Sequence, residues 1–232
     1  MRDPGLESAA ARALELVADG MHVGLGTGHA AAVFLARLAD RVRSGLRVVG
    51  VPTSEATAAL ARSLGIPLGA LDDDEQELAL TVDGADEVAP NLDLVKGFGG
   101  ALVRERIVAA ASRRQVILVG YDKLVDRLAT RGQIPIEVVP FACRLVLRRV
   151  GSLGLDPVVR LADGRRFISD NGNLTIDCGL ATPLADARAA RVLEADLRAI
   201  PGVVDTGLFL GTAERVLVGY PDGHVDVLQA RR

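Results

Sequence analysis

The sequence is poor in aromatic residues and has no excess of basic over acidic charge, and both features exclude classes of protein. Aromatic side chains make up 3% of the 232 residues and tryptophan is absent, so the stacking platforms of single-strand nucleic-acid binders are not expected. The formal net charge of -3 argues against a nucleic-acid surface dominated by basic groups. Local pairs such as Arg113-Arg114 and Arg148-Arg149 fit solvated helix faces better. We therefore expect no nucleic-acid partner.

Cysteines and long apolar runs are also scarce. The two cysteines, Cys143 and Cys178, are too few for a disulfide framework and lack metal-ligand spacing, so we expect reduced, partly buried thiols. No apolar run approaches the roughly 20 residues of a membrane span. The amino terminus, with Asp3 and Glu7, does not look like a signal peptide. These features predict a cytoplasmic globular protein with no membrane partner, built as one large domain or two small ones.

Lysine is rare, and one lysine stands at a conspicuous place. Only two of the 27 basic residues are lysines, Lys96 and Lys123. Lys96 opens the densest glycine cluster of the chain, Lys96-Gly97-Phe98-Gly99-Gly100. A lysine retained in so arginine-rich a sequence indicates a position that needs a compact ammonium group, because the guanidinium of arginine is a larger planar fork. Chance is the alternative explanation.

The first two-thirds of the chain alternate between strand-like and helix-like segments. Hydrophobic periodicity predicts strands at 21–25, 46–50, 78–82 and 115–119, and helices at 6–18, 30–38, from a turn at Pro52 to about 64, and 101–111. Such repetition predicts an α/β fold with a doubly wound parallel sheet and right-handed crossovers. The acidic run Asp72-Asp73-Asp74-Glu75 precedes a strand and is interpreted as a surface loop.

The rhythm changes near Ala129. The segment 134–139 contains Pro135 and is predicted as an edge strand, because proline cannot donate to a sheet ladder. Later patterns predict a helix at 140–151, short antiparallel strands near 158–161, 167–169 and 174–177, a helix at 184–199, and strands near 215–218 and 224–228. We expect an α/β domain of residues 1–128 plus 203–232, with an inserted α+β subdomain of residues 129–202.

Three polar or glycine-rich loops follow predicted strands and could open on the same edge of the sheet, where ligands of α/β proteins bind. The first is Gly24-Leu25-Gly26-Thr27-Gly28-His29-Ala30. Its glycines allow close approach to a ligand, and the amides of the next helix start can hold an anion. It matches neither the Walker loop nor the dinucleotide fingerprint, which favours a phosphate monoester. A tight turn without a ligand is the alternative.

The other two loops carry charged groups suited to catalysis. Asp83-Gly84-Ala85-Asp86-Glu87 brings several carboxylates together, which suits metal binding or acid–base chemistry; a solvated acidic loop is the alternative. The third loop is the glycine cluster opened by Lys96, which supplies a cation for an oxyanion or phosphate. Glu105 follows it in the first turns of a predicted helix, where its side chain could face the cleft. A glutamate that only complements the helix dipole is the alternative. His29 is expected to line the site rather than to catalyse.

Taken together, these motifs resemble ribose-5-phosphate isomerases of the A type over nearly the whole chain. The resemblance rests on seven runs, in order: 24–28 (GLGTG), 51–54 (VPTS), 82–87 (VDGADE), 96–105 (KGFGGALVRE), 133–138 (QIPIEV), 170–173 (DNGN) and 200–204 (IPGVV). It implies a Rossmann-like α/β fold with an inserted ferredoxin-like lid and a homodimer, sometimes a homotetramer. It also implies interconversion of ribose 5-phosphate and ribulose 5-phosphate in the non-oxidative pentose phosphate pathway, with no cofactor and no metal.

The resemblance also assigns roles to residues. Glu105 would be the base that moves a proton between C2 and C1 through a cis-enediol, and Lys96 would stabilise the enediolate. Asp83 and Asp86 would handle hydroxyl protons and ring opening. The implied substrate-binding residues are Thr27, Gly28, His29, Ala30, Asp83, Gly84, Ala85, Asp86, Lys96, Gly97, Phe98, Gly99 and Lys123, with Thr27 to Ala30 and Lys123 at the phosphate end.

The sequence departs from the family pattern at a few places. His29-Ala30 replaces a usual Ser-Thr pair, so phosphate binding would depend on backbone amides, helped by His29. Phe98 replaces a small or basic residue, and Glu7 replaces a lysine found in some relatives. A non-catalytic sugar-phosphate sensor is the main alternative function, but it would not need Glu105 and both aspartates. The incomplete glycine fingerprint disfavours a nicotinamide-dependent dehydrogenase.

Overall fold

The computed structural model describes residues 3–72 and 77–229, and they form two compact units. The described residues of the first unit come from 1–85, 104–123 and 212–232, and those of the second from 86–103 and 124–211. The predicted surface loop at Asp72–Glu75 lies outside the described residues except for Asp72. The predicted domain division at residues 128 and 203 stays a prediction. The compact units differ from it by including 86–103, 124–128 and 203–211 in the second unit.

The first unit is built around a six-stranded sheet with the strand order β15-β14-β6-β3-β1-β2. All neighbours are parallel except the hairpin of β14 and β15. Its elements are α1 (Pro4–Leu14), β1 (Met21–Leu25), α2 (His29–Arg43), β2 (Val48–Pro52), α3 (Glu55–Ser63), β3 (Leu80–Gly84), most of α4 (Leu102–Ala110), β6 (Gln115–Gly120), η1 (Tyr121–Lys123), β14 (Arg215–Gly219) and β15 (Val225–Gln229). The predicted parallel α/β sheet is confirmed, and the turn predicted at Pro52 begins only after that residue.

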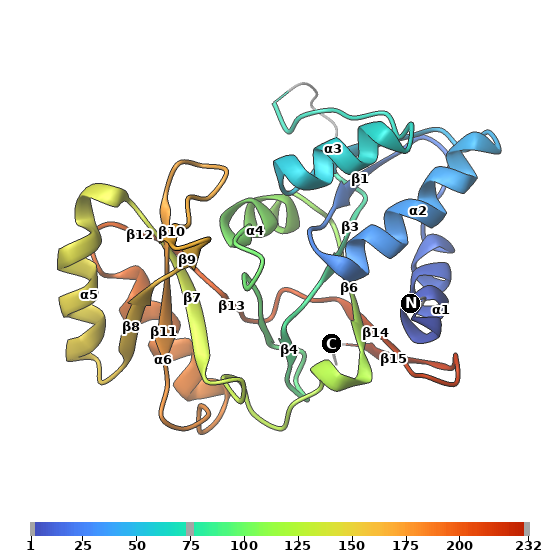
Figure 1. The fold of residues 1–232 in the computed structure, drawn as a ribbon. Helices are drawn as coiled ribbons and strands as arrows, with labels where there is room; N and C mark the ends of the chain where they lie inside the picture. Colours follow the sequence, from blue (N-terminus) through green and yellow to red (C-terminus); the bar gives the residue numbers. More distant parts are fainter. Residues whose placement is uncertain (1–2, 73–76, 230–232) are drawn as a thin grey trace. The chain divides into compact units, whose positions relative to one another are not determined.

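Helices cover both faces of this sheet (Figure 1). One face carries α1 and α2, which bury residues such as Ala13 and Phe34 against strand residues such as Leu80 and Val82. The opposite face carries α4, where Val108 packs with Val51. Strand side chains alternate between the two faces. Because helices cover both faces, the side chains on both sides of β3 are buried. The sheet is therefore doubly wound, as predicted.

The second unit contains a four-stranded antiparallel sheet with the order β12-β7-β11-β8. Its elements are β4 (Glu87–Val88), β5 (Leu94–Val95), β7 (Gln133–Val138), η2 (Pro140–Ala142), α5 (Cys143–Ser152), β8 (Asp156–Val159), β9 (Leu161–Ala162), β10 (Arg165–Arg166), β11 (Leu174–Gly179), α6 (Ala187–Arg198), β12 (Val203–Thr206) and β13 (Leu208–Phe209). Helices α5 and α6 bury Val146, Val150 and Leu197 in one core with strand residues such as Ile136 and Ile176. This βαββαβ order is the ferredoxin-like arrangement.

The prediction of β7 as an edge strand was wrong. β7 lies in the interior of its sheet, between β11 and β12. Pro135 is tolerated because its ring lies where the β12 ladder ends, beside Gly207. The Gly207 N–H donates to the carbonyl of Pro135, at 2.7 Å, while the Gly207 carbonyl accepts from the Lys96 N–H, at 2.8 Å. Because Pro135 has no N–H to donate to the Gly207 carbonyl, that carbonyl is left to accept from the N–H of Lys96.

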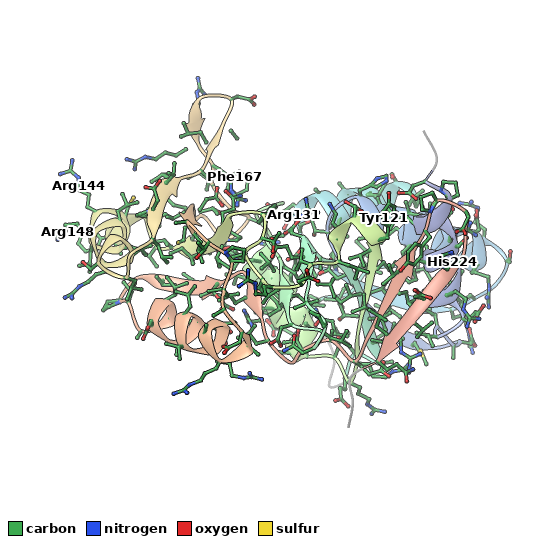
Figure 2. All side chains as sticks on the ribbon, turned by 90° about the horizontal axis from the view of Figure 1, so that it is seen from below. Tyr121, Arg131, Arg144, Arg148, Phe167 and His224 are labelled. Atoms are coloured by element: carbon green, nitrogen blue, oxygen red, sulfur yellow. The ribbon has the colours of Figure 1, made fainter. Side chains whose placement is uncertain are left out.

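Other predictions were less accurate at short elements. The strand expected near 167–169 is replaced by the two-residue strand β10 at Arg165–Arg166, and β4, β5 and β13 were not predicted. Arg144, Arg148 and Arg149 lie on the exposed face of α5, and Figure 2 shows Arg144 and Arg148 pointing outward. Among the residues that the structure describes, none of the helices has the length and apolar character needed to cross a membrane.

Candidate active site

Asp83 lies at the end of β3 and is joined to the glycine loop after β1. Strands β1 and β3 are neighbours in the sheet, so their carboxyl ends share one edge. The Oδ1 atom of Asp83, which is 0% exposed, accepts hydrogen bonds from the N–H groups of Thr27, at 3.1 Å, and Gly84, at 2.7 Å. Gly26 permits this approach, because a Cβ there would lie 2.2 Å from that oxygen. The structure thus brings together two of the predicted loops.

A cluster of hydroxyl groups holds Thr27, and the sequence analysis missed it. The Oγ1 atom of Thr27 lies 2.7 Å from Thr53 Oγ1, 2.8 Å from Ser54 Oγ and 3.1 Å from Thr57 Oγ1. Thr57 also donates to the Gly26 carbonyl, at 2.9 Å. Ser54 caps α3 by accepting from the Thr57 N–H. A serine three residues before a threonine at a helix start could have indicated the cap, but not its contact with Thr27.

Helix α2 begins directly after this loop with an amino terminus suited to an anion. Gly28, at φ 100°, precedes the helix and has no side chain to cap it, whereas Asp3, Ser54 and Asp186 cap α1, α3 and α6. The first amides of such a helix can bind a phosphate group. A hollow of about 180 Å³ lined by Thr27, Gly28 and residues of α2 and α3 adjoins the loop. His29 is exposed and Ala30 half-buried.

Glu105 lies on α4, on the face that packs against the sheet. Val108, three residues later, contacts both strands: a Cβ at Gly24 of β1 would lie 2.6 Å from Val108 Cγ1, and the Val108 carbonyl accepts from Thr81 Oγ1 of β3 at 3.3 Å. Residues three apart share a helix face, so Glu105 faces the same side and is only 5% exposed. It is therefore not a solvated helix-start glutamate.

The direction of α4 places Glu105 toward the same edge as Asp83. Residues 111–114 connect α4 to β6, too short a link to run the length of a strand, so the amino-terminal end of α4 points to the carboxyl edge. Asp83 follows Thr81 by two residues and shares its face of β3. Two buried carboxyl groups therefore occur on one side of the sheet at its carboxyl edge, where open α/β sheets bind their ligands. Such a pair suits proton transfer.

Lys123 ends the short helix after β6, the other neighbour of β3. Its side chain is 35% exposed, and its ammonium group lies 3.1 Å from Asp122 Oδ2. Thr27, Asp83 and Lys123 therefore lie at or just beyond the carboxyl ends of three adjacent strands of one sheet. Glu7, which stands where some relatives were expected to have a lysine, also lies in the first unit. It forms an ion pair with Arg37 on α2, with 2.7 Å between Arg37 Nη2 and Glu7 Oε2.

Ala85 is half-buried and ends the segment 1–85 of the first unit. The other predicted residues belong to the second unit, where Asp86 and the Lys96 loop are in contact. The Phe98 N–H donates to Asp86 Oδ2, at 3.0 Å. Lys96 is 2% exposed, and its ammonium group lies 5.5 Å from the centre of the Phe209 ring. Gly97 adopts φ 97°, and a Cβ there would lie 2.9 Å from Leu102. A buried ammonium in such close packing agrees with a position that needs lysine.

Phe98 and Gly99 complete this loop. The Phe98 side chain is partly buried against the apolar cluster that contains Val95 and Ile134. Phe98, in place of the small or basic residue expected from the family pattern, therefore contributes its ring to the core of the second unit. Gly99 is exposed. Within the described ranges, no three or more His, Cys, Asp or Glu residues are grouped so that they could hold a metal ion.

The fold and the two buried acids define an α/β protein with a candidate ligand site at the carboxyl edge of its parallel sheet. Comparison with known proteins gives the family. The profile of ribose 5-phosphate isomerase A (phosphoriboisomerase A) matches residues 49–223. A ribose-5-phosphate isomerase A of Gloeobacter violaceus is 50% identical over 223 residues, which is 96% of this chain and 94% of that protein. One from Roseiflexus castenholzii is 50% identical over 222 residues, covering 94% and 93% of the two chains.

Solved structures agree. Ribose 5-phosphate isomerase A of Methanocaldococcus jannaschii superposes with a TM-score of 0.89 at 41% identity, over 97% of each chain. A D-ribose-5-phosphate isomerase in complex with phospho-erythronic acid gives a TM-score of 0.90 at 36% identity, also over 97% of each chain. The chain belongs to the ribose-5-phosphate isomerase A family.

Proposed function

We propose that this protein interconverts D-ribose 5-phosphate and D-ribulose 5-phosphate through a cis-enediol(ate) intermediate, without a cofactor. The observation that carries the proposal is the pair of buried carboxyl groups, Asp83 and Glu105, on one side of the sheet at its carboxyl edge. Membership of the isomerase family supports the substrate. A sugar-phosphate sensor would have no need of a buried base at this place.

The proposed base is Glu105. Its carboxylate takes the proton from C2 of the open-chain aldose, and the electrons of the C2–H bond form the C1–C2 double bond while the carbonyl electrons move to O1. Glu105 then returns the proton to C1, the O2 hydroxyl loses its proton and becomes the ketose carbonyl, and the O1 oxyanion takes up a proton to become the C1 hydroxyl. One carboxylate serves both carbons because they are adjacent and the intermediate is planar.

The other charged residues take the remaining roles. Lys96 stabilises the negative charge that develops on the enediolate oxygen, and a preorganised cation lowers the barrier most where water is excluded. Asp83 and Asp86 move hydroxyl protons and open the sugar ring. Two backbone N–H groups donate hydrogen bonds to Asp83 Oδ1, and these bonds fix the orientation of the Asp83 carboxylate.

The phosphate group is proposed to bind at Thr27 to Ala30, with Lys123 as the nearby cation. The support is the uncapped start of α2 and the fixed Thr27 loop. Gly84, Ala85 and the Gly97–Gly99 backbone are proposed to contact the sugar. A relative in complex with phospho-erythronic acid supports a phosphorylated polyol chain as the ligand. The pentose phosphate pathway, a cytoplasmic location and a homodimeric or homotetrameric state remain part of this proposal.

The test is turnover of ribose 5-phosphate after exhaustive chelation. We expect formation of ribulose 5-phosphate at an undiminished rate, with solvent deuterium entering C2 of the aldose and C1 of the ketose in D2O. Binding of ribose 5-phosphate without turnover would favour the sensor. Turnover that disappears on chelation and returns with a divalent cation would refute the cofactor-free mechanism.

A further inference from the structure

Arg160, between β8 and β9, contacts the glycine cluster from within the second unit. Its Nη1 atom donates to two successive carbonyls, Gly97 at 2.9 Å and Phe98 at 2.8 Å. Its Nε atom donates to Asp177 Oδ2 at 2.9 Å, and its Nη2 atom pairs with the other oxygen of Asp177. The side chains of Arg160 and Asp177 are only 13% and 17% exposed. The guanidinium group is thus held on one side and directed at the loop on the other.

The contact has a consequence for Asp86. In the trans peptide between Gly97 and Phe98, the C=O and the N–H point in opposite directions. The C=O accepts from Arg160, and the N–H donates to Asp86 Oδ2 at 3.0 Å. One peptide group therefore connects the guanidinium to the carboxylate, and its orientation fixes where the Asp86 oxygen lies.

A second contact supports the same loop. Phe167, labelled in Figure 2, directly follows β10, and its backbone N–H donates to the Arg160 carbonyl at 2.9 Å. The Phe167 ring lies against Gly100, where a Cβ would come within 2.3 Å of it. The Arg160 guanidinium lies 5.9 Å from the centre of the same ring. The loop is therefore contacted at the carbonyls of Gly97 and Phe98 and, near its end, at Gly100.

We propose that Arg160 is a positioning residue for isomerisation, holding the Gly97–Phe98 peptide so that its N–H fixes the carboxylate of Asp86. The proposal rests on the proposed function, in which Asp86 moves hydroxyl protons. Arginine is required because its fork binds a carboxylate with one edge and still presents Nη1 to two carbonyls. Lysine has a single ammonium group and cannot occupy all of these positions at once.

The experiment compares kinetics of Arg160→Lys and Arg160→Ala with a matched control, Arg165→Lys, on the exposed strand β10. We expect kcat to fall about tenfold to a hundredfold in both Arg160 variants, as small misplacements of reacting groups can do, with KM changed less than about threefold and the control unaffected. Millimolar guanidinium ion should restore part of the activity of Arg160→Ala. Folded Arg160 variants with unchanged kcat would overturn the proposal.

Two further readouts separate this proposal from the function itself. If Arg160 acts through Asp86, adding Arg160→Ala to Asp86→Asn should cost no more than Asp86→Asn alone, whereas independent sites give additive losses. Additive losses would overturn the proposal and leave the isomerase function intact. The Phe98 amide proton should also shift as Asp86 titrates in the parent protein and not in Arg160→Ala. A shift retained in Arg160→Ala would overturn the proposal even if the parent protein did not isomerise ribose 5-phosphate.

Discussion

Replacing Gly26 by alanine should damage both the stability and the chemistry of the first unit. The added Cβ would lie 2.2 Å from Asp83 Oδ1 and 2.5 Å from the Asp83 Cα atom. Ordinary van der Waals contact begins near 3.4 Å. A new rotamer of Asp83 relieves the first clash and not the second, because Cα is part of the backbone of β3. The substitution must therefore move β1 away from β3.

The size of the effect follows from these contacts. Overpacking typically costs about 1–3 kcal/mol, and weakening the 3.1 Å bond from the Thr27 N–H to Asp83 adds about 1 kcal/mol. We expect the free energy of unfolding to fall by about 2–4 kcal/mol. Because Asp83 and the Thr27 loop lose their mutual orientation, kcat should fall at least about tenfold in the molecules that remain folded.

The assay is urea unfolding together with steady-state turnover of ribose 5-phosphate at a temperature where the variant is folded. Gly151→Ala is the matched control, because Gly151 lies in α5 and an added Cβ there would meet nothing within 4 Å beyond its chain neighbours and the helix's own backbone. Alanine in a helix should stabilise that site by up to about 1 kcal/mol. A Gly26→Ala protein with unchanged stability and unchanged kcat would refute the assigned contact between the Thr27 loop and Asp83.

Three further predictions concern Lys96, Cys178 and Glu55. Lys96→Arg should lower kcat at least about a hundredfold, because a guanidinium does not fit a buried point-charge site; an active variant would contradict that role. Burial, and secondarily the charge of Asp177, raises the pKa of Cys178 to about 12. Iodoacetamide should therefore label Cys178 only after unfolding. Prompt labelling of Cys178 in the native protein would contradict its burial. Arg104 lowers the pKa of Glu55 below its ordinary 4.5. Glu55→Gln should therefore lower the thermal midpoint near neutral pH, and the difference should vanish as the pH falls through the folded-state pKa of Glu55. A difference in thermal midpoint that persists in acid would refute the ion pair.

Much of the fold could be predicted because its long elements have clear periodicity. The parallel strands of the first unit and the helices that cover it follow from apolar alternation, and the order of the loops follows from the carboxyl-edge rule. Strands of two residues, such as β5 and β13, carry too few side chains to show a period. Pro135 misled the prediction because its place in β7 depends on Gly207, more than 70 residues away in the sequence.

The residues of the candidate site could be named from the sequence, and their supporting contacts could not. Asp83 and Lys96 were indicated by charged and glycine-rich loops after predicted strands, and Glu105 by its place in the first turns of the next helix. The supporting groups could not be predicted, because Thr57 and Arg160 act through hydrogen bonds to backbone groups 31 and 63 residues away in the sequence. Nothing local to those residues distinguishes them from a helix cap or a surface arginine.

The most direct measurement is the turnover of Glu105→Gln beside its binding of ribose 5-phosphate. The amide fills the same space on α4 but cannot accept the C2 proton, so we expect turnover to fall by about a thousandfold or more while the sugar phosphate still binds. Turnover close to that of the parent protein would show that a different group removes the proton, and the proposed mechanism would be wrong.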